Sequence, residues 1–318
     1  MIADGIHCIP IPTPFAVGRV NVYLLEDDPL TLIDTGPNSG KALDELERAL
    51  RDRGHRIEDL GLIVVSHQHI DHEGLVDILA RRSGAEVAAL EPLAEWLADY
   101  RERMQADDEF GERLMHRHGI AADVGTALRA VTAAFRGWGA PATVTRPLAA
   151  GEELRLGDRT LRVHHRPGHS PTDTVFHDEE RRLLIGADHL IKHISSNPLI
   201  TRDHSRALVT YLESLRRTRE MDVDVVLTGH GDPVDDHRAL IDDRFRMHEK
   251  RAAKIAKRIG AEGPMTAHQI AQSLWGNVAL TQAYLTLSEV LGHVDLLLDR
   301  GEVVEEEGDD GVVRFRAA

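Results

Sequence analysis

The segment HQHIDH, residues 67–72, constrains this chain more than any other stretch of its sequence. It places four metal-binding side chains, His67, His69, Asp71 and His72, within six residues. It follows LGLIVVS, an apolar run over residues 60–66 that predicts a buried strand. Three imidazoles and a carboxylate buried together would be costly unless a cation lay between them. The segment therefore predicts a metal site on the turn that ends a strand.

Three further candidate ligands follow in the sequence, each at the end of a predicted strand. They are His169 in the triplet PGH, Asp188 in GAD and His230 in TGH. Because strand ends at one edge of a sheet can converge, these side chains can meet the HQHIDH segment. Together the candidates are five His and two Asp, a nitrogen and oxygen ligand set that suits two divalent ions of zinc, manganese or iron. Cys8 is the single cysteine, which excludes a disulfide framework and a cysteine-rich zinc module.

The hydrophobic pattern predicts two domains in this chain of 318 residues. Strands and helices alternate twice over residues 1–237, which is typical of a layered α/β domain. Within it, residues 92–139 are helical in pattern and carry many of the large side chains. These residues either pack the helices together or form a helical cap over the site.

Residues 238–318 differ in character from the rest of the chain. They begin with a long basic helix, and a capping-box pattern, Thr266-Ala-His-Gln269, then opens a short helix. A further helix carries Leu287, Leu291 and Val294 on one stripe, and two strands follow about a GDDG turn. Three helices and a hairpin in this order predict a winged-helix domain.

The ordered motifs HxHxDH, PGH, strand-end Asp and GH resemble those of the metallo-β-lactamase superfamily of hydrolases, over about residues 1–236. The resemblance implies an α/β, four-layer αββα fold, here with a helical insertion and a small C-terminal winged-helix domain. It also implies the role of each ligand. One metal would be held by His67, His69 and His169, the other by Asp71, His72 and His230, and Asp188 would bridge the two.

Two residues near this pattern add detail to the resemblance. Asp34, in Ile-Asp-Thr-Gly, matches an aspartate that orients a ligand histidine in the superfamily, although an Asp here could also cap a turn. Ala187 stands where relatives usually carry Gly directly before the bridging Asp. This departure affects only the local freedom of the backbone.

The resemblance favours a glyoxalase II-like hydrolase that needs no protein nucleophile. A hydroxide bridging two metal ions, with zinc favoured over manganese and iron, would attack an ester, thioester or lactone carbonyl, and Asp71 and Asp188 would hold the catalytic metals. His69 stands where diiron flavoproteins of this fold have Glu, which disfavours oxygen reduction. Asp188 stands where many β-lactamases have Cys or no bridging carboxylate, which disfavours β-lactam hydrolysis. A mononuclear iron persulfide dioxygenase has an overlapping ligand set and remains an alternative.

Single-stranded RNA is the rival substrate, because the C-terminal domain resembles that of a lactamase-like endoribonuclease. The formal net charge of −15 and the acidic residues Glu289, Asp295 and Asp299 on the helix that would read a groove argue against nucleic acid. The helix over residues 244–258 argues for an anionic ligand, since Glu249 is its only acidic residue. Its seven cations are Arg244, Arg246, Lys250, Arg251, Lys254, Lys257 and Arg258. Such a run is either a solvated helix face or a surface for a small anionic substrate.

The remaining predictions concern substrate contacts, partners and location. Lys192, His193 and Asn197 follow the bridging Asp and are candidate substrate contacts, with an ordinary loop as the equal alternative. A non-enzymatic winged-helix regulator is disfavoured because all seven ligands are present. The chain has no apolar stretch of about 20 residues and no signal-peptide pattern, which predicts a cytoplasmic protein without a membrane partner. The winged helix could pack on the catalytic domain or on the second subunit of a homodimer.

Overall fold

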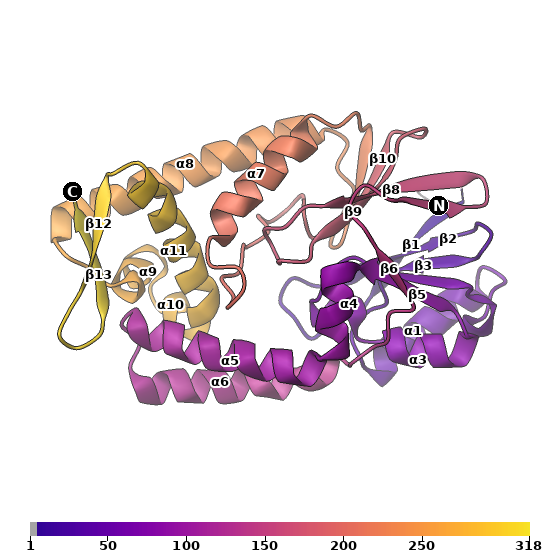
Figure 1. Cartoon of the computed structure of the whole chain (residues 1–318), viewed down its shortest axis with the longest axis horizontal. Coiled ribbons are helices and arrows are strands. Elements are labelled where there is room, and N and C mark those ends of the chain that lie inside the picture. Colours follow the sequence, from indigo (N-terminus) through magenta and orange to yellow (C-terminus); the bar gives the residue numbers. More distant parts are fainter. Residues whose placement is uncertain (1–4) are drawn as a thin grey trace. The chain divides into compact units, whose positions relative to one another are not determined.

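The computed structural model describes residues 5–318, which form two compact units (Figure 1). The first unit contains the described residues up to Arg103, then residues 135–196 and 220–237. The second contains residues 104–134, 197–219 and 238–318. All seven candidate metal ligands lie in the first unit.

The first unit contains a six-stranded mixed sheet in the order β1-β2-β3-β4-β5-β6. Its strands are β1 (Ile6–Ile11), β2 (Val20–Leu25), β3 (Thr31–Ile33), β4 (Leu62–Val65), β5 (Glu86–Leu90) and β6 (Arg146–Leu148). The first three strands are antiparallel, and β3 to β6 are parallel. Each residue of β4 is buried, as expected for a parallel strand that is covered on both faces. This strand leads directly into the HQHIDH segment.

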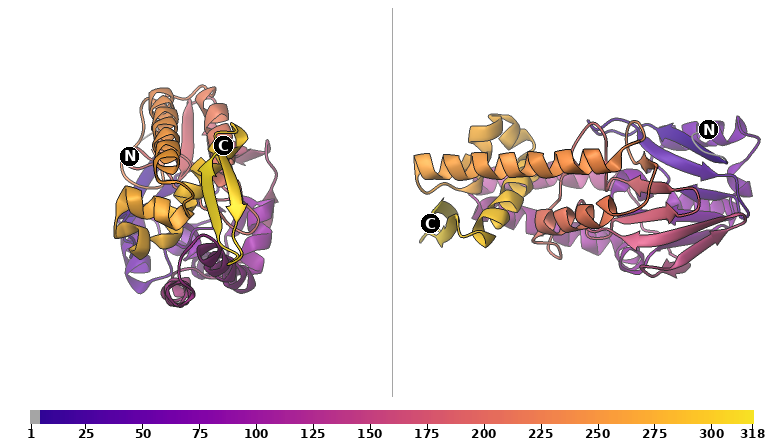
Figure 2. Two further views of the ribbon diagram at one scale, coloured as in Figure 1. Left: turned by 90° about the vertical axis from the view of Figure 1, so that its left-hand side faces the viewer. Right: turned by 90° about the horizontal axis from the view of Figure 1, so that it is seen from above.

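The second sheet of this unit has five strands in the order β11-β10-β9-β8-β7. They are β7 (Glu153–Leu156), β8 (Arg159–His165), β9 (Thr174–Asp178), β10 (Leu183–Ala187) and β11 (Val225–Thr228). Only β10 and β11 are parallel, and their register shifts between Ile185 and Ala187. Such an irregularity bends a strand and redirects the side chain that follows, which here is Asp188. The two sheets lie against each other in Figure 2.

The helices of the first unit are short and follow the local sequence signals. They are α1 (Gly40–Arg51), η1 (Ile57–Asp59), α2 (Ile70–Glu73), α3 (Val76–Ser83), α4 (Glu91–Ala98) and η2 (Arg136–Trp138). Ser39 caps α1 by accepting a hydrogen bond from the backbone N–H of Ala42 at 3.1 Å. The same helix buries Leu46 and Leu50 and packs against β1.

The second unit is mainly helical around one apolar core. Its elements are most of α5 (Tyr100–Arg117) and α6 (Ala122–Phe135), with α7 (Ala207–Arg219), α8 (His237–Glu262), α9 (Ala267–Trp275), α10 (Val278–Thr281), α11 (Ala283–Asp299), β12 (Val303–Glu307) and β13 (Val313–Ala317). Met115, Ile255, Leu287 and Phe315 belong to the core, so α5, α8, α11 and β13 contribute to it. The capping box of Thr266 and Gln269 opens α9, as the sequence predicts. Among the described residues, no helix is both long enough and apolar enough to cross a membrane.

Candidate metal centre

The seven candidate ligands meet at loops that follow strands of both sheets. His67, His69, Asp71 and His72 lie between β4 and the end of α2. His169 lies in the loop from β8 to β9, Asp188 directly follows β10, and His230 follows β11. The convergence therefore joins segments more than 160 residues apart in the sequence.

One group of ligand atoms is formed by three imidazoles and a carboxylate. Nε2 of His67 lies 3.1 Å from Nδ1 of His69, which in turn lies 2.8 Å from Nε2 of His169. Nε2 of His169 lies 3.5 Å from Oδ2 of Asp188. The four residues each offer an atom within 4.8 Å of the others, a spacing that one metal ion can fill.

A second group is formed by Asp71, His72 and His230, again within 4.8 Å of one another. Nε2 of His230 lies 3.4 Å from Oδ2 of Asp71. Asp188 adjoins this group as well, because its Oδ1 lies 3.4 Å from Nε2 of His72 and its Oδ2 lies 3.5 Å from Nε2 of His230. The Asp188 carboxylate thus stands between the two groups.

Burial keeps the imidazoles of His67 and His69 neutral. It lowers the pKa of His67 well below its usual value and that of His69 to about 3, and neighbouring imidazoles lower both further. Neutral imidazole is the form that binds metal.

The carboxylate beside these rings stays ionised. Burial opposes the charge of Asp188, but His72 and His230 hold its pKa well below the usual value. Nε2 of His72 and Oδ1 of Asp188 are buried and have no hydrogen-bond partner among the residues that the structure describes. A divalent cation would satisfy both atoms, so the residues present fit a metal site.

Two family models match the chain. The metallo-beta-lactamase superfamily matches residues 16–230, and the metallo-beta-lactamase-like C-terminal domain matches residues 254–318. The chain belongs to the metallo-beta-lactamase superfamily. The predicted family and the predicted α/β fold with a small C-terminal domain are therefore confirmed.

Relatives from this superfamily match the chain along its whole length. "Probable metallo-hydrolase YqjP" of Bacillus subtilis is 32% identical over 321 residues and covers 99% of both chains. A solved metallo-beta-lactamase family protein of Thermus thermophilus is 27% identical, with a TM-score of 0.84 over 100% of both chains. A beta-lactamase domain protein of Burkholderia ambifaria is 29% identical, with a TM-score of 0.81 over 100% of this chain and 94% of that one. With the ligand clusters, these findings confirm a metal-dependent hydrolase of the metallo-beta-lactamase superfamily.

In this metallo-beta-lactamase superfamily member, Asp34 orients two of the candidate ligands. Its Oδ2 accepts a hydrogen bond from Nδ1 of His72 at 2.8 Å, and its two oxygens accept from the Ser66 hydroxyl and backbone N–H, each at 2.8 Å. Because the Ser66 hydroxyl donates to Asp34, its oxygen accepts from Nδ1 of His67 at 2.9 Å. Both rings then present Nε2 to the site. The role of Ser66 was missed, although its place directly before His67 was a usable signal.

The loop that carries His230 is held by residues from the N-terminal sheet. Nδ1 of His230 donates to the backbone carbonyl of Arg19 at 2.8 Å. Asn21 and Tyr23 donate to the carbonyl of Thr228 at 3.0 and 2.6 Å. Sequence reasoning missed both contacts, and the only signal was a buried amide in the otherwise apolar strand β2.

The loop that carries His169 is held by a buried carboxylate. Asp173 accepts hydrogen bonds from the backbone N–H of Ser170 at 2.8 Å and from its hydroxyl at 2.6 Å. Burial raises the pKa of Asp173 to about 6. The hydroxyl of Thr172 donates to the Gln68 side chain at 2.6 Å, which links this loop to the HQHIDH segment. The positioning roles of Asp173, Ser170, Thr172 and Gln68 were not predicted.

Two backbone features allow Asp188 to reach the site. Gly229 lies so close to Asp188 that a Cβ there would overlap Oδ1 and would lie 2.9 Å from Cε1 of His72. Ala187 has a φ of 42°, in the left-handed region that glycine adopts without cost. The Ala in place of Gly therefore carries a backbone strain, whereas the sequence predicted an effect only on the local freedom of the backbone.

The three predicted substrate contacts lie in different surroundings. Nζ of Lys192 donates to the carbonyl of Pro233 at 3.4 Å, and the exposed His193 faces Asp232, with Nε2 3.6 Å from its carboxylate. Both lie against the loop that follows His230. Asn197 begins the second unit, where its Nδ2 donates to the carbonyl of Leu285 at 3.1 Å. All three roles stay predictions.

A third cluster of metal-competent side chains lies in the second unit. His248, Glu289 and His293 are buried and offer atoms within 4.8 Å of one another. Glu289 is paired with Arg251, and Nδ1 of His293 donates to the backbone carbonyl of Glu289. Nδ1 of His248 then donates to Nε2 of His293 at 3.1 Å. The cluster is a hydrogen-bonded link between α8 and α11.

Proposed function

We propose that this protein is a dinuclear metal hydrolase that cleaves a small-molecule ester, thioester or lactone. The observation that carries the proposal is the position of Asp188. Its two oxygens lie 3.4 to 3.5 Å from nitrogens of His72, His169 and His230, which belong to both ligand groups. A carboxylate placed in this way can bridge two cations, whereas a single metal would leave one group without an ion.

In this proposal, each ligand has a defined task. His67, His69 and His169 would hold one metal, Asp71, His72 and His230 would hold the other, and Asp188 would serve both. When bound, two divalent cations would supply a nucleophile from water near neutral pH and would polarise the scissile carbonyl. The chain itself fixes the ring of His72 through Asp34 and the His169 loop through Asp173. Five nitrogen and two carboxylate ligands favour zinc over harder ions such as magnesium.

Metal analysis of the purified protein is the first test. The proposal expects two equivalents of zinc or manganese for each chain. One equivalent of iron, together with oxygen consumption on a persulfide, would overturn it in favour of a dioxygenase.

Hydrolysis by matched variants is the second test, with thioester, lactone and ester substrates assayed beside a single-stranded RNA. His169→Ala and Asp188→Ala should lose metal and hydrolysis together, while the exposed control His116→Ala should keep both. Full hydrolysis by either ligand variant would refute the assignment. Cleavage of RNA alone would replace it with an endoribonuclease.

A further inference from the structure

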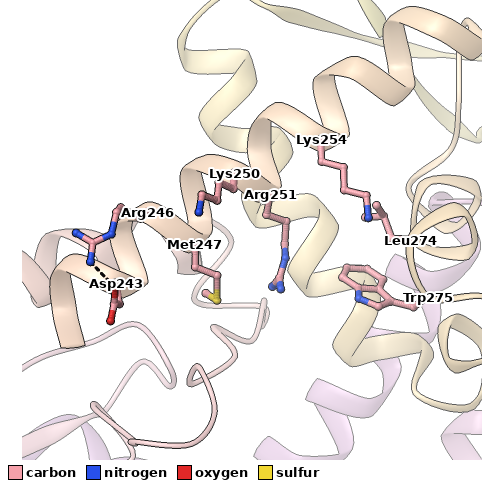
Figure 3. Close-up of a pocket in the computed structure, with 8 residues that line it drawn as sticks. All are labelled: Asp243, Arg246, Met247, Lys250, Arg251, Lys254, Leu274 and Trp275. Carbon is pink, nitrogen blue, oxygen red and sulfur yellow. Dashed lines mark hydrogen bonds and ion pairs between the residues drawn. The ribbon is translucent and has the colours of Figure 1, made fainter. Parts of the chain in front are cut away.

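The second unit carries a cavity of about 430 Å³ between α8 and α9 (Figure 3). The residues that line it are Asp243, Arg246, Met247, Lys250, Arg251, Lys254, Leu274 and Trp275. None of them is a candidate metal ligand, and all of them belong to one unit. The volume lies at the lower end of the range for small-molecule sites.

The cavity carries an excess of positive charge on an acidic chain. Arg246 pairs with Asp243, and Arg251 pairs with Glu289. No ion pair within residues 5–318 neutralises Lys250 or Lys254, which both project from exposed positions on α8. The two ammonium groups are thus available to bind an anion that enters the cavity, whereas both guanidinium groups are already paired, and Asp243 is the one carboxylate among the lining residues.

The opposite wall of the cavity is aromatic and apolar. Figure 3 shows Arg251 and Lys254 extending from α8 toward Leu274 and Trp275 on α9. The Arg251 guanidinium lies 5.8 Å from the centroid of the indole ring of Trp275. This ring is only half-buried, so it offers planar surface beside the cations.

The combination differs from an ordinary solvated helix face. Cations on such a face point into water and away from one another, whereas here Arg251 lies by the indole of Trp275 and Lys254 extends toward Leu274 on the same helix. A phosphate satisfies several cations at once, because it carries up to two charges and three terminal oxygens. An aromatic ring attached to it can contact the indole, as bases do on aromatic side chains in nucleotide sites.

We propose that this cavity binds a phosphate-bearing ligand with an aromatic ring, of the mononucleotide class. The phosphate contacts Lys250 and Lys254, and the ring lies against Trp275. The site shares no residue with the metal centre, and its occupancy does not depend on the metal ligands.

The test measures binding of AMP to the full-length protein by isothermal titration calorimetry, with adenosine and inorganic phosphate in parallel. AMP should bind more tightly than either fragment, and added salt should weaken its binding. The double variant Lys250→Ser/Lys254→Ser should weaken binding by about tenfold or more, because it removes two charged contacts. Trp275→Ala should weaken AMP more than inorganic phosphate.

Two control variants separate this cavity from other sources of binding. Lys257→Ser removes an exposed cation of the same helix outside the cavity and should bind AMP as the wild type does. Asp188→Ala should also bind AMP unchanged, which excludes capture of the phosphate by the metal centre.

Four results would overturn the proposal. They are no AMP binding at about 1 mM ligand, equal binding of AMP and inorganic phosphate, undiminished binding by the lysine double variant, and loss of binding in Asp188→Ala. A single-stranded oligonucleotide that binds where AMP does not, and that the double variant releases, would instead assign the surface to nucleic acid.

Discussion

Nδ1 of His72 donates a hydrogen bond to Oδ2 of Asp34 at 2.8 Å, deep inside the first unit, where both side chains are almost fully buried. The bond fixes the tautomer and the plane of the imidazole, so that Nε2 faces Asp188. Asp34 reaches this position with a φ of 60°, a conformation that Asp and Asn tolerate better than most residues.

Asp34→Asn tests this relationship, because the amide keeps the shape and the backbone conformation but loses the charge. We expect metal affinity to fall by about 10- to 100-fold, as is typical when the partner of a ligand histidine is changed. Competition with a chelator measures the loss. Asp44→Asn, on the exposed face of α1, is the matched control, and equal affinities of the two variants would contradict the assigned role.

Gly229→Ala should empty the metal centre while the fold persists. The added Cβ would overlap Oδ1 of Asp188 and crowd His72, so the bridging carboxylate must move. Bound metal and hydrolysis should both fall, and circular dichroism should stay unchanged. Gly260→Ala is the matched control, because nothing lies within 4 Å of that position on α8. Retention of metal by Gly229→Ala would show that Asp188 is not needed where the structure places it.

Ala187→Gly should relieve backbone strain. A left-handed conformation costs a residue other than glycine about 1–2 kcal/mol. The control Ala89→Gly removes a methyl from an equally buried strand position without any positive φ. We expect Ala187→Gly to exceed Ala89→Gly in free energy of unfolding by about 1–2 kcal/mol, measured by urea denaturation. Equal stabilities would mean that the conformation at residue 187 carries no strain.

Acid should destabilise the second unit partly through His118. Burial, with a contribution from Arg117, lowers the pKa of His118 from 6.5 to about 4. The unfolded chain therefore binds a proton at pH values where the folded chain does not. This part of the free energy of unfolding is present above pH 6.5 and is lost as the pH falls toward 4. Between neutral pH and pH 5 the loss is on the order of 2 kcal/mol.

His118→Phe isolates this effect, because it keeps a ring stacked on Phe315 and removes the titration. The variant should lose less free energy of unfolding on acidification than the wild type, and the exposed control His116→Phe should behave as the wild type does. Parallel pH curves for all three proteins would contradict a neutral, buried His118.

The ligand segments could be predicted from the sequence because their signals are local. HQHIDH follows an apolar run, and Asp188 and His230 follow strands whose apolar runs are short and bounded by glycine. The contacts that hold these ligands could not be predicted in this way. Tyr23 and Thr228 are separated by 205 residues, and only the packing of one sheet on the other brings them together.

The grouping of the helices also depends on tertiary contacts. The pattern over residues 92–139 correctly predicts helices, but it gives no sign that residues 104–134 pack with residues 197–219 and 238–318. The surroundings of the basic run on α8 also depend on tertiary contacts, because the spacing of its residues in the sequence does not show that Trp275 faces Arg251. The predicted domain boundary at residue 237 and the predicted cap over the site stay predictions.

Asp71 and His72 follow a strand of the first sheet, whereas Asp188 and His230 follow strands of the second. A bound cation would therefore link two sheets that are synthesised at different times during translation. The growing chain would lack the complete set of metal ligands until His230 had left the ribosomal exit tunnel. Metal binding would then come late in the folding of a newly made chain. A shortage of metal in the cell would first weaken the packing of one sheet on the other.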